Sequence, residues 1–114
     1  MITFNADHQM EVRKQMKGGK GEAHVVPMIK EGLCKNSRLF ATITLPAGSS
    51  IGYHVHENET ELFYFVSGTG RVQDDEKTVE VHPGDAMQTT SGHGHSVENI
   101  GEDDLVLVAC IVLD

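Results

Sequence analysis

The chain has 114 residues, enough for a single hydrophobic core and therefore for one domain spanning 1–114. Its net charge of −8 argues against nucleic acid as a partner, because an acidic surface repels the phosphate backbone. The longest apolar run, residues 105–113, is too short to span a bilayer, so we expect no membrane partner. The opening residues lack a signal-peptide pattern, and Cys34 and Cys110 lack a paired spacing, which predicts a cytoplasmic protein with reduced thiols.

Residues 1–36 form a basic segment ahead of an acidic remainder. Up to residue 38, seven Lys and Arg accompany four acidic residues, whereas residues 39–114 hold two Lys and Arg and thirteen acidic residues. Met10, Val12 and Met16 hint at one amphipathic helical turn, which the following glycines end. Residues 22–30 indicate a strand, and Pro27 favours an edge position for it, since proline has no amide hydrogen. We expect this segment to pack on the rest of the chain or on a partner subunit.

Residues 37–114 are predicted to fold as a series of short strands. Leu39, Ala41, Ile43 and Leu45 alternate onto one face of a strand over residues 38–45. Residues 69–73 and 78–82 predict a hairpin, and a type II turn at 83–84 leads into a strand over 85–90. Strands over 95–100 and 105–113 follow, the last apolar enough to be buried on both faces. This pattern predicts an all-β fold, an antiparallel barrel or jelly roll.

The strand over residues 61–66 has two apolar faces. If Glu61 points inward, Phe63 and Phe65 share its face and line the interior, whereas Leu62, Tyr64 and Val66 face outward. An apolar outer face needs a cover. Together with the basic segment and the acidic remainder, this face leads us to expect a homodimer.

A candidate metal site lies between Gly48 and Gly68. His54 and His56 are two residues apart in a predicted strand, so both side chains point to the same side. Glu61 on the next strand can meet them there. Imidazole nitrogens and a carboxylate oxygen are ligands for a divalent first-row metal, and this ligand type admits Fe, Mn, Ni, Cu or Zn.

Two motifs resemble those of the cupin superfamily. The first, Gly-x5-His-x-His-x4-Glu-x6-Gly, is matched at every defined position by residues 48–68. The second, Gly-x5-Pro-x-Gly-x2-His-x3-Asn, is carried by Gly84, Gly92, His95 and Asn99, with Thr90 in place of the proline. The fifteen residues between the motifs resemble the spacing of compact single-domain members. The resemblance implies a double-stranded β-helix, or jelly-roll, barrel over residues 37–114, and His95 as the fourth metal ligand.

Further residues are candidates for the pocket around the metal. Asn99 shares the face of His95 and either supports the site or shapes the strand end. His93 is a turn residue that can also reach a ligand. Either Met87 and Thr89 or Gln88 and Thr90 line the cavity, because the two pairs have opposite parity. Arg38 is the barrel's one cation outside the hairpin, where Arg71 and Lys77 lie, and is a candidate anion clamp.

The sequence leaves the function open between two classes. A small metal-dependent dioxygenase, acting on an uncharged or metal-chelating small molecule, is supported by the ligand set and the apolar wall of Phe63 and Phe65. A non-catalytic module that binds or senses a small ligand through the same metal is supported by the lack of an acid or base beyond the ligands. A sugar isomerase or lyase is a further alternative, disfavoured by the scarcity of cations for a phosphate. The catalytic residues and the substrate stay unassigned.

Overall fold

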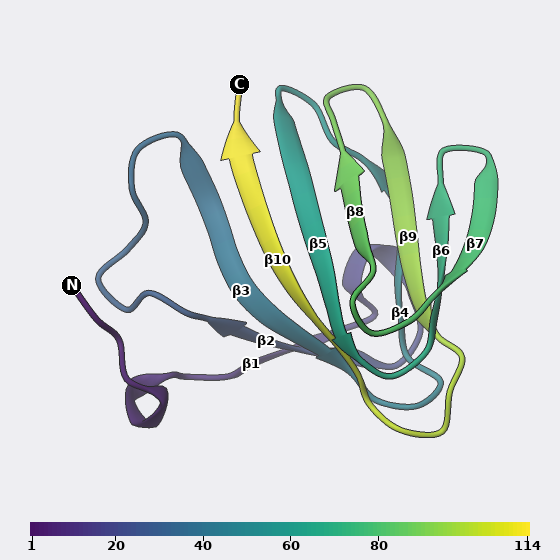
Figure 1. Ribbon diagram of the computed structural model, residues 1–114, viewed down its shortest axis with the longest axis horizontal. Coiled ribbons are helices and arrows are strands. Elements are labelled where there is room, and N and C mark those ends of the chain that lie inside the picture. Colours follow the sequence, from purple (N-terminus) through teal and green to yellow (C-terminus); the bar gives the residue numbers. More distant parts are fainter.

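The computed structural model describes residues 1–114 and is built almost entirely of β-strands (Figure 1). The strands are β1 (Glu11–Lys14), β2 (Glu22–Pro27), β3 (Ser37–Leu45), β4 (Ser50–Val55), β5 (Glu59–Ser67), β6 (Gly70–Asp74), β7 (Lys77–Val81), β8 (Ala86–Thr89), β9 (Gly94–Asn99) and β10 (Leu105–Leu113). Two short 3-10 turns, η1 (Asn5–Asp7) and η2 (Met16–Gly18), are the only helical elements. None of these is long and apolar enough to cross a membrane.

The strands form two antiparallel sheets. The larger has the order β1-β2-β3-β10-β5-β8 and the smaller the order β4-β9-β6-β7. Strands β1, β2 and β3 are successive neighbours in the larger sheet and β6 and β7 in the smaller, whereas the other connections pass from one sheet to the other, for example from β3 to β4 and from β9 to β10. This is the jelly-roll arrangement, and the predicted all-β fold is confirmed. The predicted hairpin is β6–β7, where Asp74 pairs with Lys77.

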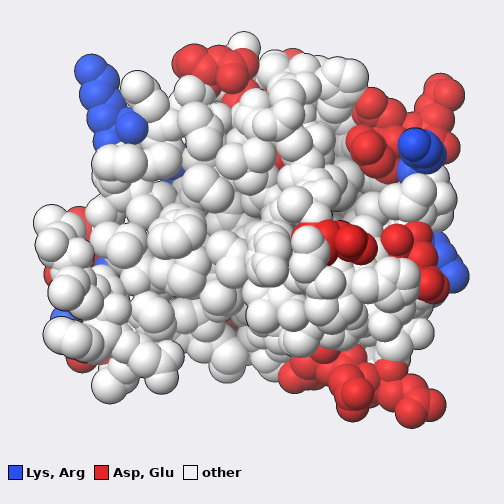
Figure 2. All heavy atoms as spheres, viewed as in Figure 1, with Lys and Arg blue, Asp and Glu red and all other residues white.

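The core lies between the two sheets because side chains alternate along each strand. Leu45 and Phe65 are fully buried, as are Leu105 and Leu107 at the start of β10. The prediction that residues 105–113 are buried on both faces is wrong: Leu105, Leu107, Ala109 and Ile111 are buried, while the residues between them are partly exposed. Strand β10 lies at the centre of its sheet, and its outward residues Val106, Val108 and Cys110 are partly exposed. Figure 2 shows a broad uncharged surface over β3, β10 and β5.

The N-terminal segment contributes two strands to the larger sheet. Strand β2 pairs with β1 on one side and β3 on the other, so the prediction of an edge strand is wrong, and β1 is the edge. Pro27 is the last residue of β2, where the missing amide hydrogen costs little. The helical turn suggested by Met10, Val12 and Met16 is confined to η2, which begins at Met16, because Val12 lies in β1.

The turn after β7 adopts the predicted conformation. Gly84 has a φ of +94°, and the Asp85 amide donates to the His82 carbonyl at 3.0 Å. A positive φ at the third residue of a turn is the type II signature and favours glycine. Both cysteines are free, as expected.

Candidate metal centre

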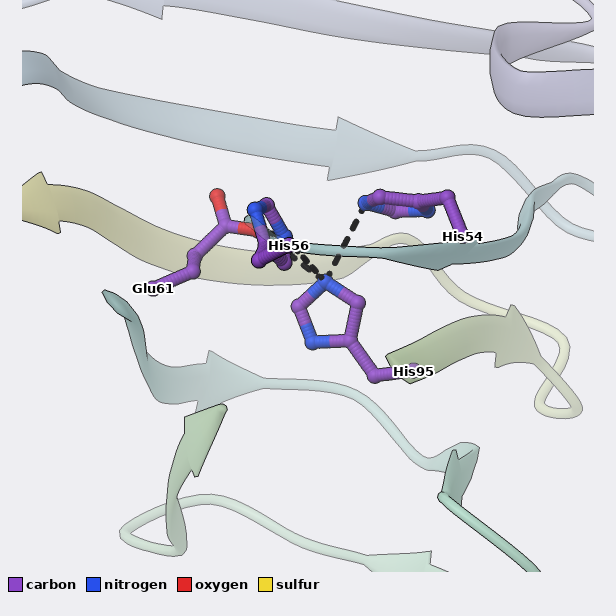
Figure 3. A group of neighbouring side chains, drawn as sticks. All are labelled: His54, His56, Glu61 and His95. Atoms are coloured by element: carbon purple, nitrogen blue, oxygen red, sulfur yellow. Dashed lines mark hydrogen bonds and ion pairs between the residues drawn. The ribbon is translucent and has the colours of Figure 1, made fainter. Parts of the chain in front are cut away.

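Three strands from both sheets bring the four predicted ligands together. His54 lies on β4 and faces His95 on β9 directly in the strand register. His56 follows β4, and its amide donates to the His93 carbonyl at 3.0 Å. Glu61 enters from β5 in the other sheet. Figure 3 shows the four side chains converging on one point inside the barrel.

The N-terminal segment holds the strand that carries His54. The pairing of β4 with β9 shifts between Ile51 and His54, a bulge that re-aims the following side chain. Turn η2 packs on β4 at this bulge. Gly52 allows that approach, because a Cβ there would overlap the Lys17 carbonyl. The basic segment is thus part of the support of the site.

The donor atoms lie at coordination spacing. His95 Nε2 is 3.1 Å from His56 Nε2 and 3.2 Å from His54 Nε2, and Glu61 Oε1 is 3.0 Å from both His56 Nε2 and His95 Nε2. All four ligand atoms lie within 4.8 Å of one another. Two donors at right angles on an ion with bonds of about 2.1 Å are about 3 Å apart. The observed spacing therefore fits one ion held by all four.

His54 and His56 each use Nδ1 for a hydrogen bond outside the cluster, and this bond decides that the lone pair of Nε2 points inward. His54 Nδ1–H donates to the Gly52 carbonyl at 2.8 Å, and His56 Nδ1–H donates to Glu59 Oε2 at 2.6 Å. Carbonyl and carboxylate oxygens only accept, so each Nε2 is unprotonated in the neutral ring. Burial lowers the pKa of His54 and outweighs the hydrogen bond to Gly52, which raises it; the neighbouring His95 and His56 lower it further. The His54 ring is therefore neutral at neutral pH and offers Nε2 as a metal ligand.

The cluster is chemically suited to a cation. The lone pairs of His54 Nε2 and His56 Nε2 and the Glu61 carboxylate face one another. His95 can donate at most one hydrogen to this group of acceptors. Such a set of acceptors is costly inside a protein unless a positive charge neutralises it. Three imidazoles and one carboxylate suit a divalent transition metal, and on a six-coordinate ion about two positions remain open. His54 is the most exposed of the four donor residues.

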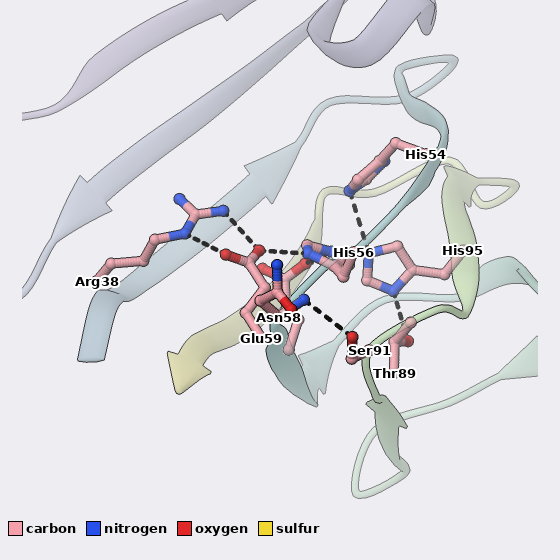
Figure 4. A network of polar contacts seen from close by, with 9 residues as sticks. Arg38, His54, His56, Asn58, Glu59, Thr89, Ser91 and His95 are labelled. Carbon is pink, nitrogen blue, oxygen red and sulfur yellow. Dashed lines mark hydrogen bonds and ion pairs between the residues drawn. The ribbon is translucent and has the colours of Figure 1, made fainter. Parts of the chain in front are cut away.

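A second carboxylate, Glu59, supports His56 from behind (Figure 4). Besides accepting from His56, Glu59 receives a two-pronged pair from Arg38, with both N···O distances at 2.7 Å. The hydrogen bond from Arg38, together with that from His56, lowers the pKa of Glu59 to about 2. Glu59 is not among the residues that the sequence motifs pointed to, although it shares the inward face of Glu61 two residues away.

Two further side chains contact His95. Thr89 Oγ1 shares a hydrogen bond of 2.8 Å with His95 Nδ1 and is almost fully buried. The ring of Phe63 stacks on His95 with centroids 4.8 Å apart and planes 9° apart. Of the alternatives left open for β8, Thr89 and the partly buried Met87 thus face the interior. Gln88 and Thr90 are exposed, so the placement of Gln88 in the pocket is wrong.

The remaining candidates lie away from the donor atoms. Phe65 is fully buried in the core, 6.1 Å from the Phe63 ring. His93 is exposed and donates from Nδ1 to Asp75 at 2.6 Å. Asn99 shapes the strand end, because Nδ2 donates to the carbonyls of Leu45 and Asp103 and Oδ1 accepts from the Gly101 amide. Arg38 is engaged by Glu59 and is not a free anion clamp.

Comparison with known proteins agrees with this geometry. The family model of the cupin domain matches residues 41–112, a stretch that begins within β3, ends within β10 and includes all four clustered residues. The chain belongs to the cupin family. The compact single-domain barrel expected from the two motifs is therefore the fold of this cupin.

Relatives of this cupin include two full-length matches from Thermotoga maritima. One is an oxalate-binding protein, 40% identical over 114 residues, which cover 99% of this chain and 94% of the relative. The other is a crystal structure described as a predicted oxalate decarboxylase, 40% identical, with a TM-score of 0.94 and complete coverage of both chains. The cupin domain of Schizosaccharomyces pombe Cnp3 is 16% identical, with a TM-score of 0.74 over 91% of this chain and 69% of that one, and shares the fold.

Proposed function

We propose that this cupin binds one divalent transition metal through His54, His56, Glu61 and His95, and through that metal a small chelating carboxylate of the oxalate class. The observation that carries the metal is the convergence of four donor atoms at separations of 3.0–3.2 Å between neighbours. The relationship to an oxalate-binding protein over nearly the full length of both chains supports the ligand class.

The charges around the site favour a ligand that is recognised by the metal itself. Arg38 is held by Glu59, and Arg71 lies on the β6–β7 hairpin, paired with Glu98 at 3.2 Å. A phosphate or an extended dicarboxylate would need a free Arg or Lys clamp. A chelator with two oxygens needs only two open coordination positions on the ion. A bound metal would supply these positions together with its Lewis acidity.

The protein's own residues fix and shield the site. His56 and His95 are oriented by Glu59 and Thr89, and Phe63 covers one face of His95, excluding water on that side. Three surface clefts lie elsewhere on the molecule and include none of the four donor residues. We expect a ligand to approach the ion past His54, the one donor residue that is not fully buried.

Calorimetric titration of oxalate into metal-loaded and chelator-treated protein tests the proposal. We expect binding only to the loaded protein, with acetate, which offers one carboxylate, binding more weakly. Equal oxalate binding to both forms would contradict a metal-mediated site, and retention of no metal would remove it altogether.

A second candidate is a metal-dependent dioxygenase. The apolar face that Phe63 presents beside the donor cluster favours it, because a small apolar gas needs no polar clamp. Oxygen uptake by the iron- or manganese-loaded protein with phenolic, thiol and diketone substrates separates this activity from binding alone. A sugar-phosphate isomerase is not favoured, since Arg38 is already paired.

A further inference from the structure

Arg38, Glu59 and His56 form a continuous polar chain from the surface to the donor cluster. Half-exposed Arg38 contacts Glu59 through Nε and one terminal nitrogen, both at 2.7 Å. Glu59 is nearly buried and uses Oε2 to accept from His56 Nδ1 at 2.6 Å. His56 Nε2 in turn lies 3.0 Å from Glu61 Oε1. Each link is a charged or charge-assisted contact of short length.

We propose that Arg38 and Glu59 are positioning residues for the metal centre: Arg38 clamps Glu59, and Glu59 holds His56 in the tautomer and orientation that present Nε2 to the ion. This inference rests on the proposed function, because it concerns the same four-residue site.

The geometry explains why a carboxylate is required at residue 59. Both neighbours of Glu59, the guanidinium and the His56 Nδ1–H, are donors, so this position must accept from two directions. A glutamine has only one acceptor oxygen, and its amide NH2 would face one of these donors. If that NH2 faced His56, it would favour a lone pair at Nδ1 and therefore a hydrogen at Nε2, which removes the ligand.

Arg38 and Glu59 come from different strands of the larger sheet. Residues 38 and 59 lie on β3 and β5, which are separated in the sheet by β10. The two side chains meet at the end of the sheet where the Leu113 of β10 pairs with Glu59. Arg38 thus fixes the Glu59 carboxylate from outside the barrel without entering the donor cluster.

The test compares two arginine–carboxylate pairs. Glu59→Gln and Arg38→Met disrupt the clamp, while Arg71→Met and Glu98→Gln disrupt the exposed pair at 3.2 Å on the smaller sheet and serve as matched controls. We expect Glu59→Gln to weaken metal affinity by roughly 10–100-fold, as loss of a supporting hydrogen bond to a ligand does elsewhere. Arg38→Met should weaken it less, and the controls not at all. Affinity is measured by competition with a coloured chelator.

A second readout separates positioning from general stability. In metal-free protein, nitrogen NMR of the imidazole rings should report Nδ1–H for His56 in the native chain and a shift toward Nε2–H in Glu59→Gln. Native metal affinity and an unchanged tautomer in Glu59→Gln would overturn the proposal while leaving metal binding by the native chain intact. Failure of the native chain to bind metal would instead overturn the proposed function.

Discussion

The interior of the barrel differs between its two ends, although the same strands build both. Along β5 the inward residues change from Glu59 and Glu61 to Phe63 and Phe65, and along β9 they change from His95 to Val97. On both strands the inward side chains thus go from polar to apolar. One end is thus a set of acceptors and the other an apolar core. Alternation decides which residues face inward, and residue type alone decides whether that end stabilises the fold or binds a ligand.

The two ends should respond to mutation in opposite ways. Removing side chains from the apolar end should reduce stability and leave metal binding intact, because those side chains hold no donor atom. Removing donors from the polar end should strongly weaken metal binding and leave the metal-free fold intact, because a buried carboxylate among imidazoles contributes little to stability without its cation.

The largest expected effect is at the apolar end. Phe65 is fully buried, so Phe65→Ala should lower the free energy of unfolding by about 3–5 kcal/mol, through lost burial and the cavity left behind. Denaturant unfolding of the metal-free protein measures this change. Loss of metal stoichiometry in the folded variant would contradict the separation of the two ends.

At the polar end, Glu61→Gln keeps the size of the side chain and removes the charge. We expect metal affinity to fall by roughly 100-fold or more, above the ~10–100-fold typical of supporting residues. The free energy of unfolding in the presence of chelator should not fall. A full equivalent of metal in this variant would show that Glu61 is not a ligand.

Asn99 tests whether the end of β9 away from His95 stabilises the fold without supporting the metal site. Its side chain satisfies the buried Leu45 carbonyl and two groups of the following turn. Asn99→Ala should lower the free energy of unfolding by about 2 kcal/mol, since it leaves buried polar groups unpaired. Metal affinity, measured on the folded fraction, should match that of the native chain. A large loss of affinity would instead place Asn99 in the support of the site.

The smallest effect is expected from Thr89, which shares a buried hydrogen bond with His95 Nδ1. Thr89→Val removes the hydroxyl at nearly constant shape and should weaken metal affinity by about 10-fold. Thr89→Ser keeps the hydroxyl and is the control, with near-native affinity. Identical affinities in the two variants would mean that the orientation of His95 depends on Phe63 stacking alone.

The donor cluster could be predicted from strand alternation together with the resemblance to the cupin motifs. His54 and His56 share a face through a spacing of two, Glu61 follows on the next strand along the chain, and the resemblance to the second motif supplied His95. Alternation also identified Phe63 and Phe65 as inward, and Leu62, Tyr64 and Val66 as outward. The expectations from alternation depend only on the strand period, which the barrel preserves.

The support of the cluster could not be predicted, because it depends on strand register. Arg38 meets Glu59 only because β10 pairs with both β3 and β5, and sequence periodicity does not reveal which strands lie side by side. The same limit explains the error at β2. Pro27 withholds one amide hydrogen at the last residue of the strand and does not prevent pairing along the rest of it.

Metal content tests the central claim, that the polar end of the barrel is a mononuclear metal site, most directly. Native protein and Glu61→Gln are purified side by side without chelator, reconstituted anaerobically with Fe, Mn, Ni, Cu or Zn, and analysed for bound metal. We predict one equivalent of at least one of these metals per native chain and almost none in the variant. Absence of metal from the native chain under every condition would contradict the account.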